Sequence, residues 1–399
     1  MTTKINLKTI FIVTTFFLFF SCAKQEKTVS VSDKTSNETL PTIQPSTEKL
    51  ANLSKGYIIQ KRIPAKEFCD NYWKDDTDNL SFLVARNGQI IYEKYNGFGN
   101  LETKTKMDQN TSLHIASVSK VLTATAILLL IDAGKIELDQ KVTTILENFP
   151  YPKITIKTLL NHRSGLRNYA YFTDDKTIWD SSKTLTNQAI LNLFTEKNLQ
   201  LDYPTDTRFC YCNTNYAMLA LIIEKVTKTN YKDAMKRMIF NPLGMKNTYV
   251  FDIEKDVEKI TPSYRGNGSK FAIDFLDGVY GDKNIYSTPR DLLKFDMAIN
   301  ATTFLNPALK KKMYQGYSYE SKGEKNYGLG IRMIEWETGQ KYYFHNGWWH
   351  GNTSSFVTLK NERVAIIALS NRFTKNVYTI RKLAPLFGDY PFVFNDGEE

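Results

Sequence analysis

Residues 114–135 read HIASVSKVLTATAILLLIDAGK. Within this stretch, residues 118–131 are apolar on nearly every side, which is typical of a helix buried inside a domain rather than one lying on its surface. Gly134 follows the last apolar turn, where a glycine in the left-handed conformation commonly ends a helix. The sequence therefore predicts a buried helix around which the rest of the domain packs.

Ser117 and Lys120 stand three residues apart at the start of this helix. Side chains at this spacing lie on one helix face with Cβ atoms roughly 5 to 6 Å apart, so the lysine can reach the serine hydroxyl. A serine needs such a neighbour to become a nucleophile, and the unpaired N–H groups of a first helical turn can stabilise an oxyanion. We predict that Ser117 and Lys120 are a catalytic pair, although the same spacing also occurs at Ser21 and Ser46.

The composition indicates a large globular enzyme. The chain has 399 residues, of which 42% are hydrophobic and 13% aromatic, enough for an extensive core. Its net charge of +10 is spread along the chain without a block of like charges, which favours solvated lysine-rich faces over nucleic-acid binding. Because no C-x-x-C pair or H-E-x-x-H motif accompanies the four histidines, we expect no metal. We also expect no other cofactor and no obligate protein partner.

The first 22 residues are predicted to be a lipoprotein signal peptide. Lys4 and Lys8 precede an apolar run, residues 10–20, which is too short to span a bilayer and suits a secretory signal. Ser21 and Cys22 follow and resemble a bacterial lipidation site, with Cys22 as the lipidated residue; an ordinary secretory signal is the alternative. Residues 23–55 contain no aromatic residue and predict a flexible tether. We therefore expect a membrane-anchored protein of the cell envelope that faces the periplasm or the exterior.

Three further cysteines could form a disulfide. Cys210 and Cys212 are too close in sequence for a relaxed bridge to each other. A bridge from Cys69 to one of them is possible in an oxidising compartment, and nothing in the sequence decides the pairing.

The secondary-structure pattern predicts an α+β domain over residues 56–390, followed by a tail, 391–399. Residues 81–86 and 89–95 form a β-hairpin pattern around Asn87-Gly88. Residues from about 138 to 300 carry helical spacing, and the strand pattern returns at 329–334, 342–345, 354–359 and 364–370, with a closing helix at 377–387. We expect a mainly antiparallel sheet built from N- and C-terminal strands, flanked by helices, with the helical region inserted.

Two further clusters carry polar and aromatic side chains. Residues 209–216 read FCYCNTNY and place Tyr211 and Asn213 two apart, just before a helix expected to start near Tyr216. Residues 344–351 read FHNGWWHG at the end of a predicted strand, where Gly347 would let a ligand approach the backbone. Taken alone, the first also fits a packing aromatic before a helix, and the second a glycine turn with an incidental histidine.

In this order, the three clusters resemble the serine β-lactamase and penicillin-binding-protein superfamily, in which a Ser-x-x-Lys motif, a Tyr/Ser-x-Asn motif and a Lys-Thr-Gly-type strand share one site. The class C β-lactamase-like branch is the most similar, because its members have Tyr-x-Asn second and often His-x-Gly third. Four other segments agree with this branch: IKTLLNHRSGL at 156–166, NPLGM at 241–245, YSTPRDL at 286–292 and YGLG at 327–330.

The resemblance implies a role for each matching residue. Ser117 would be the acylated nucleophile, and Lys120 and Tyr211 would share its proton and later activate water. Asn213 would hold either the substrate amide or Lys120. The oxyanion hole would consist of the amides of Ser117 and Trp348.

The resemblance places His345 among the substrate-binding residues, where a true β-lactamase has lysine. It would gain charge only as the pH falls through about 6.5, so that neutral esters or amides would be handled better than carboxylates. Because a histidine with its ordinary pKa near 6.5 is mostly neutral at pH 7, we expect weak carboxylate recognition and poor β-lactam turnover. The resemblance thus implies a hydrolase of a small-molecule or peptide substrate, an amide or ester such as a D-amino-acid peptide or a carboxylic ester. The alternatives are a β-lactamase or D-Ala-D-Ala carboxypeptidase proper, a receptor that stays acylated, and an inert scaffold.

Overall fold

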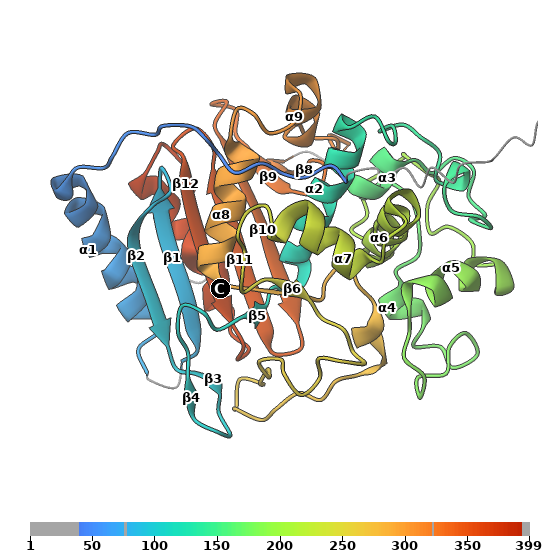
Figure 1. The fold of residues 1–399 in the computed structure, drawn as a ribbon, viewed down its shortest axis with the longest axis horizontal. Helices are drawn as coiled ribbons and strands as arrows, with labels where there is room; N and C mark the ends of the chain where they lie inside the picture. Colours follow the sequence, from blue (N-terminus) through green and yellow to red (C-terminus); the bar gives the residue numbers. More distant parts are fainter. Residues whose placement is uncertain (1–39, 76–77, 321–322, 393–399) are drawn as a thin grey trace, which may run out of the picture. The chain divides into compact units, whose positions relative to one another are not determined.

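A seven-stranded antiparallel sheet carries the fold (Figure 1). The computed structural model describes residues 40–75, 78–320 and 323–392, so the predicted signal peptide with Cys22 lies outside the described residues. The strand order is β2-β1-β12-β11-β10-β9-β8. Their bounds are β1 Leu80–Arg86, β2 Gln89–Asn96, β8 Lys325–Tyr327, β9 Arg332–Glu335, β10 Lys341–Trp349, β11 Asn352–Leu359 and β12 Val364–Ser370.

The sheet joins the two ends of the domain, as the sequence predicts. The N-terminal strand β1 pairs with the C-terminal strand β12, with Ser81 opposite Leu369. Side chains alternate between the two faces along β1. Phe82 and Val84 pack in one cluster with α1 (Lys55–Tyr72) and the 3₁₀ helix η5 (Asn376–Leu386), whereas Leu83 and Ala85 belong to the larger core on the other face. The α+β fold class is therefore confirmed.

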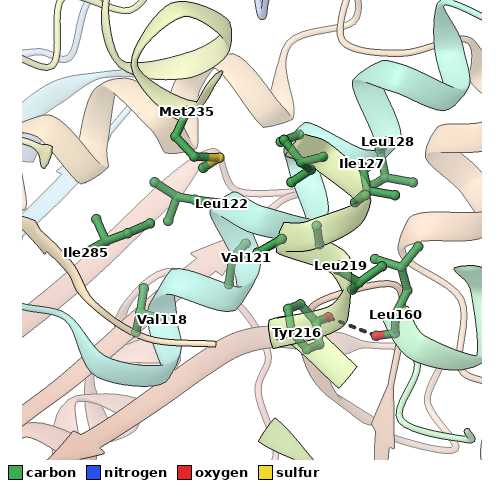
Figure 2. Packing of buried hydrophobic residues seen from close by; sticks show 14 of the residues in the cluster. Val118, Val121, Leu122, Ile127, Leu128, Leu160, Tyr216, Leu219, Met235 and Ile285 are labelled. Atoms are coloured by element: carbon green, nitrogen blue, oxygen red, sulfur yellow. Dashed lines mark hydrogen bonds between the residues drawn. The ribbon is translucent and has the colours of Figure 1, made fainter. Parts of the chain in front are cut away.

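The predicted central helix is α2 (Ser119–Asp132), and it is buried along almost its whole length. Figure 2 shows Val121, Leu122 and Ile127 of this helix among side chains from α6 (Asn213–Thr227) and α7 (Tyr231–Met235). Gly134 has a φ of 66° just beyond the helix, which confirms the predicted left-handed end. The site residues described below are attached to this helix and to its neighbours.

A largely helical region lies between β5 (Leu113–His114) and β8, and it contains short strands that the sequence pattern does not indicate. These are β6 (Tyr249–Val250) and β7 (Ile285–Ser287), which form a three-stranded sheet with β5. The remaining elements are β3 Phe98–Asn100, β4 Thr105–Lys106, η1 Ala116–Val118, η2 Val142–Thr144, α3 Ile156–Leu160, α4 Tyr169–Phe172, α5 Asn187–Glu196, the π-helix η3 Lys236–Phe240, η4 Phe275–Gly278, α8 Pro289–Asn300 and α9 Pro307–Met313.

The folded chain begins before the predicted boundary. Residues 40–54 have no regular structure, yet Ile43 is buried in the core and its N–H donates to the carbonyl of Met238 at 2.9 Å. The side chain of Ser54 then accepts the N–H of Tyr57 at 3.1 Å and caps α1. The predicted tether therefore does not extend over residues 40–55, because an apolar anchor within a polar segment is enough to hold it against the domain.

Other features differ from the prediction or add to it. Of the segment predicted as a strand at 329–334, only the part from Arg332 on is strand, as β9, whereas Gly330, at a φ of 90°, lies in the turn that follows β8. The closing helix is of the 3₁₀ type and contains Pro385. Cys69, Cys210 and Cys212 are free thiols. In the part of the chain that the structure describes, no helix combines the length and apolar character needed to cross a membrane.

Candidate active site

Ser117 lies on the short 3₁₀ turn η1, between β5 and α2. The residue before it, Ala116, has a φ of 47°, an uncommon conformation for a non-glycine residue that is typically found where function requires it. The N–H of Ala116 donates to Nδ1 of His114 at 3.0 Å, which holds the turn. Ser117 is half-buried in an otherwise buried segment. The strained turn thus presents this one hydroxyl to the site.

Lys120 is completely buried, and its Nζ has three polar neighbours. Nζ lies 3.1 Å from Oγ of Ser117, 2.9 Å from Oδ1 of Asn213 and 2.9 Å from the carbonyl oxygen of Asp282. Asn213 is the first residue of α6, which begins three positions before the predicted start. The structure thus brings the predicted Ser117–Lys120 pair together and places Asn213 against the lysine.

The three contacts of Lys120 fit either protonation state. The Asn213 and Asp282 oxygens can only accept, so they take two hydrogens from the amine whether it is neutral or charged. The remaining tetrahedral position faces Ser117 and holds a lone pair in the neutral amine or an N–H in the ammonium ion. A proton can therefore pass between Ser117 and Lys120 without rearranging the other two hydrogen bonds.

Tyr211 lies beside the lysine, just before α6. The centroid of its ring is 5.0 Å from Nζ of Lys120 and 4.6 Å from Cζ of Arg332. Within residues 40–75, 78–320 and 323–392, the Tyr211 hydroxyl has no hydrogen-bond partner, and the side chain is half-buried. This hydroxyl is therefore free to bond with a substrate.

Gly347 on β10 packs directly against the nucleophile turn. A Cβ at this position would lie 2.8 Å from the amide nitrogen of Ser117, 2.6 Å from the carbonyl oxygen of Ile115 and 2.4 Å from Oγ of Ser354. The close approach expected at Gly347 is thus made by the protein's own backbone. The next residue, Trp348, is 64% exposed and its indole N–H donates to the carbonyl of His350 at 2.9 Å.

The His345 side chain lies beneath the site. It is completely buried, and its Nδ1 is 2.8 Å from the carbonyl oxygen of Asn346, so Nδ1 carries the hydrogen. Nε2 therefore accepts from the hydroxyl of Tyr327 at 3.1 Å. Burial, together with the positive charge of Arg332, holds the pKa of His345 well below its usual value. The expectation that this side chain contacts substrate and gains charge near pH 6.5 is wrong, because both ring nitrogens are occupied inside the protein.

Arg332 on β9 is a cation of the site that the sequence does not single out. Its guanidinium packs 4.6 Å from the Tyr211 ring and 6.0 Å from the Tyr327 ring. No carboxylate of the described residues forms an ion pair with it, and the side chain is half-buried. Arg332 reaches the site because the strand register places it opposite Tyr327 and Phe344. No local sequence motif predicts this register.

Asp274, Asp277 and His350 form a second polar cluster, spaced so that it could hold a metal ion. The cluster borders a cavity of about 490 Å³ that is not lined by Ser117, Lys120 or Tyr211. Asp277 already accepts the indole N–H of Trp349, the N–H of Asp274 and Nε2 of His350 at 2.6, 2.7 and 3.0 Å. The bond between Asp274 and Asp277 caps η4, and the other two tie this helix to β10 and the residue after it. The cluster therefore has a structural role.

Comparisons with known proteins agree with this geometry. The family described as Beta-lactamase matches residues 66–384. Penicillin-binding protein 4* of Bacillus subtilis is 30% identical over 312 residues, which is 74% of this chain and 68% of the relative. A D-aminopeptidase of Cereibacter sphaeroides is 24% identical over 290 residues; the match spans 72% of this chain and 55% of that protein. The structure of a penicillin binding protein from Bacillus halodurans shares the fold, with a TM-score of 0.70 and 22% identity over 81% of this chain and 98% of that one. The chain therefore belongs to the beta-lactamase family and is a serine hydrolase.

Proposed function

We propose that Ser117 is the nucleophile and that the enzyme hydrolyses an amide or ester through an acyl-enzyme. The observation that carries the proposal is the buried Lys120 amine, which has two fixed acceptors and a third position facing Ser117. As Oγ of Ser117 bonds to the acyl carbon of the substrate, its proton passes to the lone pair of Lys120. Because the other hydrogen bonds of Lys120 stay in place, this transfer needs little reorganisation.

Tyr211 and two backbone amides complete the proposed reaction. The free Tyr211 hydroxyl donates its proton to the leaving group, and the resulting phenolate takes a proton from the water that cleaves the acyl-enzyme, while Lys120 returns its proton to Oγ of Ser117. The amides of Ser117 and Trp348 stabilise the negative oxygen of the tetrahedral intermediate, and such donors are each worth about 10² to 10³ in rate. The tight packing of Gly347 on the Ser117 amide supports this pairing, since it brings β10 against the nucleophile turn.

From Arg332 we infer that the substrate carries a negative group beside the scissile bond, as in a peptide that ends in a D-amino acid. The guanidinium is always charged, it has no carboxylate partner among the described residues, and it borders Tyr211. This replaces the expectation, based on His345, that neutral substrates are preferred. The similarity to a D-aminopeptidase supports a D-amino-acid residue in the substrate, and the negative group is inferred from Arg332 alone.

Matched substrates test the role of Arg332. A D-alanyl ester substrate with a free carboxylate would be compared with its neutral methyl ester. The substitution Arg332→Gln removes one charge-assisted hydrogen bond, so kcat/KM for the carboxylate form should fall about ten- to a hundred-fold while the methyl ester changes little. Arg332→Lys should recover part of the loss. Equal effects on both substrates would show that Arg332 does not recognise charge.

Turnover separates the hydrolase from its main alternative, a receptor that stays acylated. A hydrolase releases many product molecules per Ser117, whereas a receptor releases one and stops. Steady-state turnover of an activated ester beyond the first equivalent supports hydrolysis, and a single burst without turnover contradicts it. Nitrocefin assayed in parallel distinguishes a β-lactamase proper.

A further inference from the structure

His162, next to the end of α3, contacts the chain on both sides of Tyr211. Its carbonyl oxygen accepts the N–H of Cys210 at 2.9 Å, and its Nδ1 accepts the N–H of Cys212 at 3.1 Å. Its ring centroid lies 4.4 Å from that of Tyr211. One residue therefore fixes the backbone before and after Tyr211 and packs against the phenol ring itself.

The surroundings of the imidazole fix its tautomer. Besides Cys212 N–H, Nδ1 receives the side-chain amide of Asn215 at 3.1 Å, because the Oδ1 of Asn215 is taken by the hydroxyl of Ser164. Nδ1 thus holds the lone pair and Nε2 carries the hydrogen. Burial, together with the positive charge of Arg332, holds the pKa of His162 well below its usual value. The ring is therefore neutral, and it cannot turn without breaking both bonds.

His162 has no access to a substrate. The side chain is completely buried, and its Nε2 has no hydrogen-bond partner among residues 40–75, 78–320 and 323–392. The centroid of its ring is 4.4 Å from that of Tyr211, 5.2 Å from that of Tyr216 and 4.8 Å from that of Tyr327. A direct part in acid–base chemistry with substrate is therefore excluded by position, and Tyr211 is the proposed catalytic residue that the ring contacts.

We propose that His162 is a positioning residue that holds the Tyr211 hydroxyl in place for proton transfer. The proposal rests on the catalytic role given to Tyr211 above. Backbone hydrogen bonds on either side of Tyr211 fix where its Cα lies, and the imidazole face limits the swing of its ring. A proton-transfer group misplaced by about 1 Å loses on the order of a hundred-fold in rate.

Two substitutions separate the contributions of His162. His162→Asn can keep an acceptor at the position of Nδ1, and asparagine tolerates the φ of 58° found here. His162→Phe keeps a flat ring but leaves the Cys212 N–H without an acceptor. His350→Asn is the matched control, since that histidine bonds to Asp277 and does not contact Tyr211.

Each substitution would be made alone and combined with Tyr211→Phe, and kcat and KM measured with an activated ester. Rates are divided by the amount of enzyme that a fluorophosphonate labels at Ser117, so that unfolded protein does not count. We expect His162→Phe to lower kcat about ten- to a hundred-fold with little change in KM, His162→Asn to retain more of it, and His350→Asn to resemble the wild type. In the Tyr211→Phe background, neither His162 substitution should lower kcat further, because the group it positions is gone.

Three results would overturn the proposal. The first is a normal kcat for His162→Phe. The second is a double variant whose fall in kcat equals the product of the falls in the His162 variant and in Tyr211→Phe. The third is a His162→Asn protein that the fluorophosphonate no longer labels at Ser117, which would show that His162 is needed for folding. Tyr211→Phe alone tests the proposed function separately. If Tyr211→Phe keeps normal turnover, the catalytic role of Tyr211 fails; if it loses turnover and the His162 effects multiply with it, only the positioning role fails.

Discussion

Gly347→Ala should damage the reaction by displacing Ser117, because the added methyl group would press on the turn that carries the nucleophile and its amide. The glycine lies within β10, outside the left-handed region of φ, so alanine meets no backbone restriction there. The added methyl group would instead approach Oγ of Ser354, the Ile115 carbonyl and the Ser117 amide at 2.4, 2.6 and 2.8 Å. Two of these three atoms belong to the backbone, so they cannot move aside as a flexible side-chain end could.

The size of the effect follows from these distances. The Ser117 amide would have to retreat by about 0.6 Å to reach the 3.4 Å at which ordinary contact begins. Because a displacement of about 1 Å costs on the order of a hundred-fold, we expect kcat to fall roughly ten- to a hundred-fold. Overpacking should also lower the free energy of unfolding by about 1 to 3 kcal/mol.

The assay compares turnover of an activated ester per fluorophosphonate-labelled enzyme, together with urea unfolding. Gly56→Ala is the matched control, since this glycine lies in α1 with no atom within 4 Å of an added Cβ. There alanine should raise stability by about 0.5 to 1 kcal/mol and leave turnover unchanged. A Gly347→Ala enzyme with turnover within twofold of the wild type would refute the inferred contact between β10 and the nucleophile turn.

Three other predictions concern proton transfer, pH and anchoring. Tyr211→Phe keeps the ring, so stability should change little while kcat falls by roughly 10² to 10⁴; near-normal turnover would leave Tyr211 as a packing residue. The pKa of His345 is lowered in the folded protein, so below pH 6.5 the unfolded chain binds a proton that the folded protein does not. The free energy of unfolding therefore falls as the pH drops below 6.5. Between pH 7 and pH 5.5, the free energy of unfolding measured by urea titration should fall by about 1 kcal/mol less in His345→Gln than in the wild type. An equal fall in both proteins would contradict the burial of His345. Cys22→Ser should move the protein from the membrane to the soluble fraction, and persistent membrane association would rule out the proposed lipid anchor.

The parts of the fold that could be predicted are those with a local signal. The β1–β2 hairpin has Asn87-Gly88 between two alternating segments, and α2 has a continuous apolar surface ended by Gly134. The small sheet of β5, β6 and β7 has no such signal, because each strand is only two or three residues long and Leu113 pairs with Ser287. Such pairing depends on the surrounding fold rather than on periodicity.

The same limit applies to the site. The contact between Ser117 and Lys120 follows from helical spacing, and the resemblance to known motifs indicated Tyr211 and Asn213. Arg332 and the carbonyl of Asp282 are brought to the site only by sheet register and a loop, so no sequence pattern could select them. The inward position of His345 likewise follows from its hydrogen bond with Tyr327, a partner on another strand.

The most direct test of the central claim is to locate the acyl group on the enzyme. The protein would be treated with a fluorophosphonate or a slowly hydrolysed ester, digested, and mapped by mass spectrometry. We predict one modified peptide, which carries the added mass on Ser117 and is lost in Ser117→Ala. Labelling that persists in Ser117→Ala, or that maps to Ser46, would contradict the assignment of the nucleophile and the mechanism built on it.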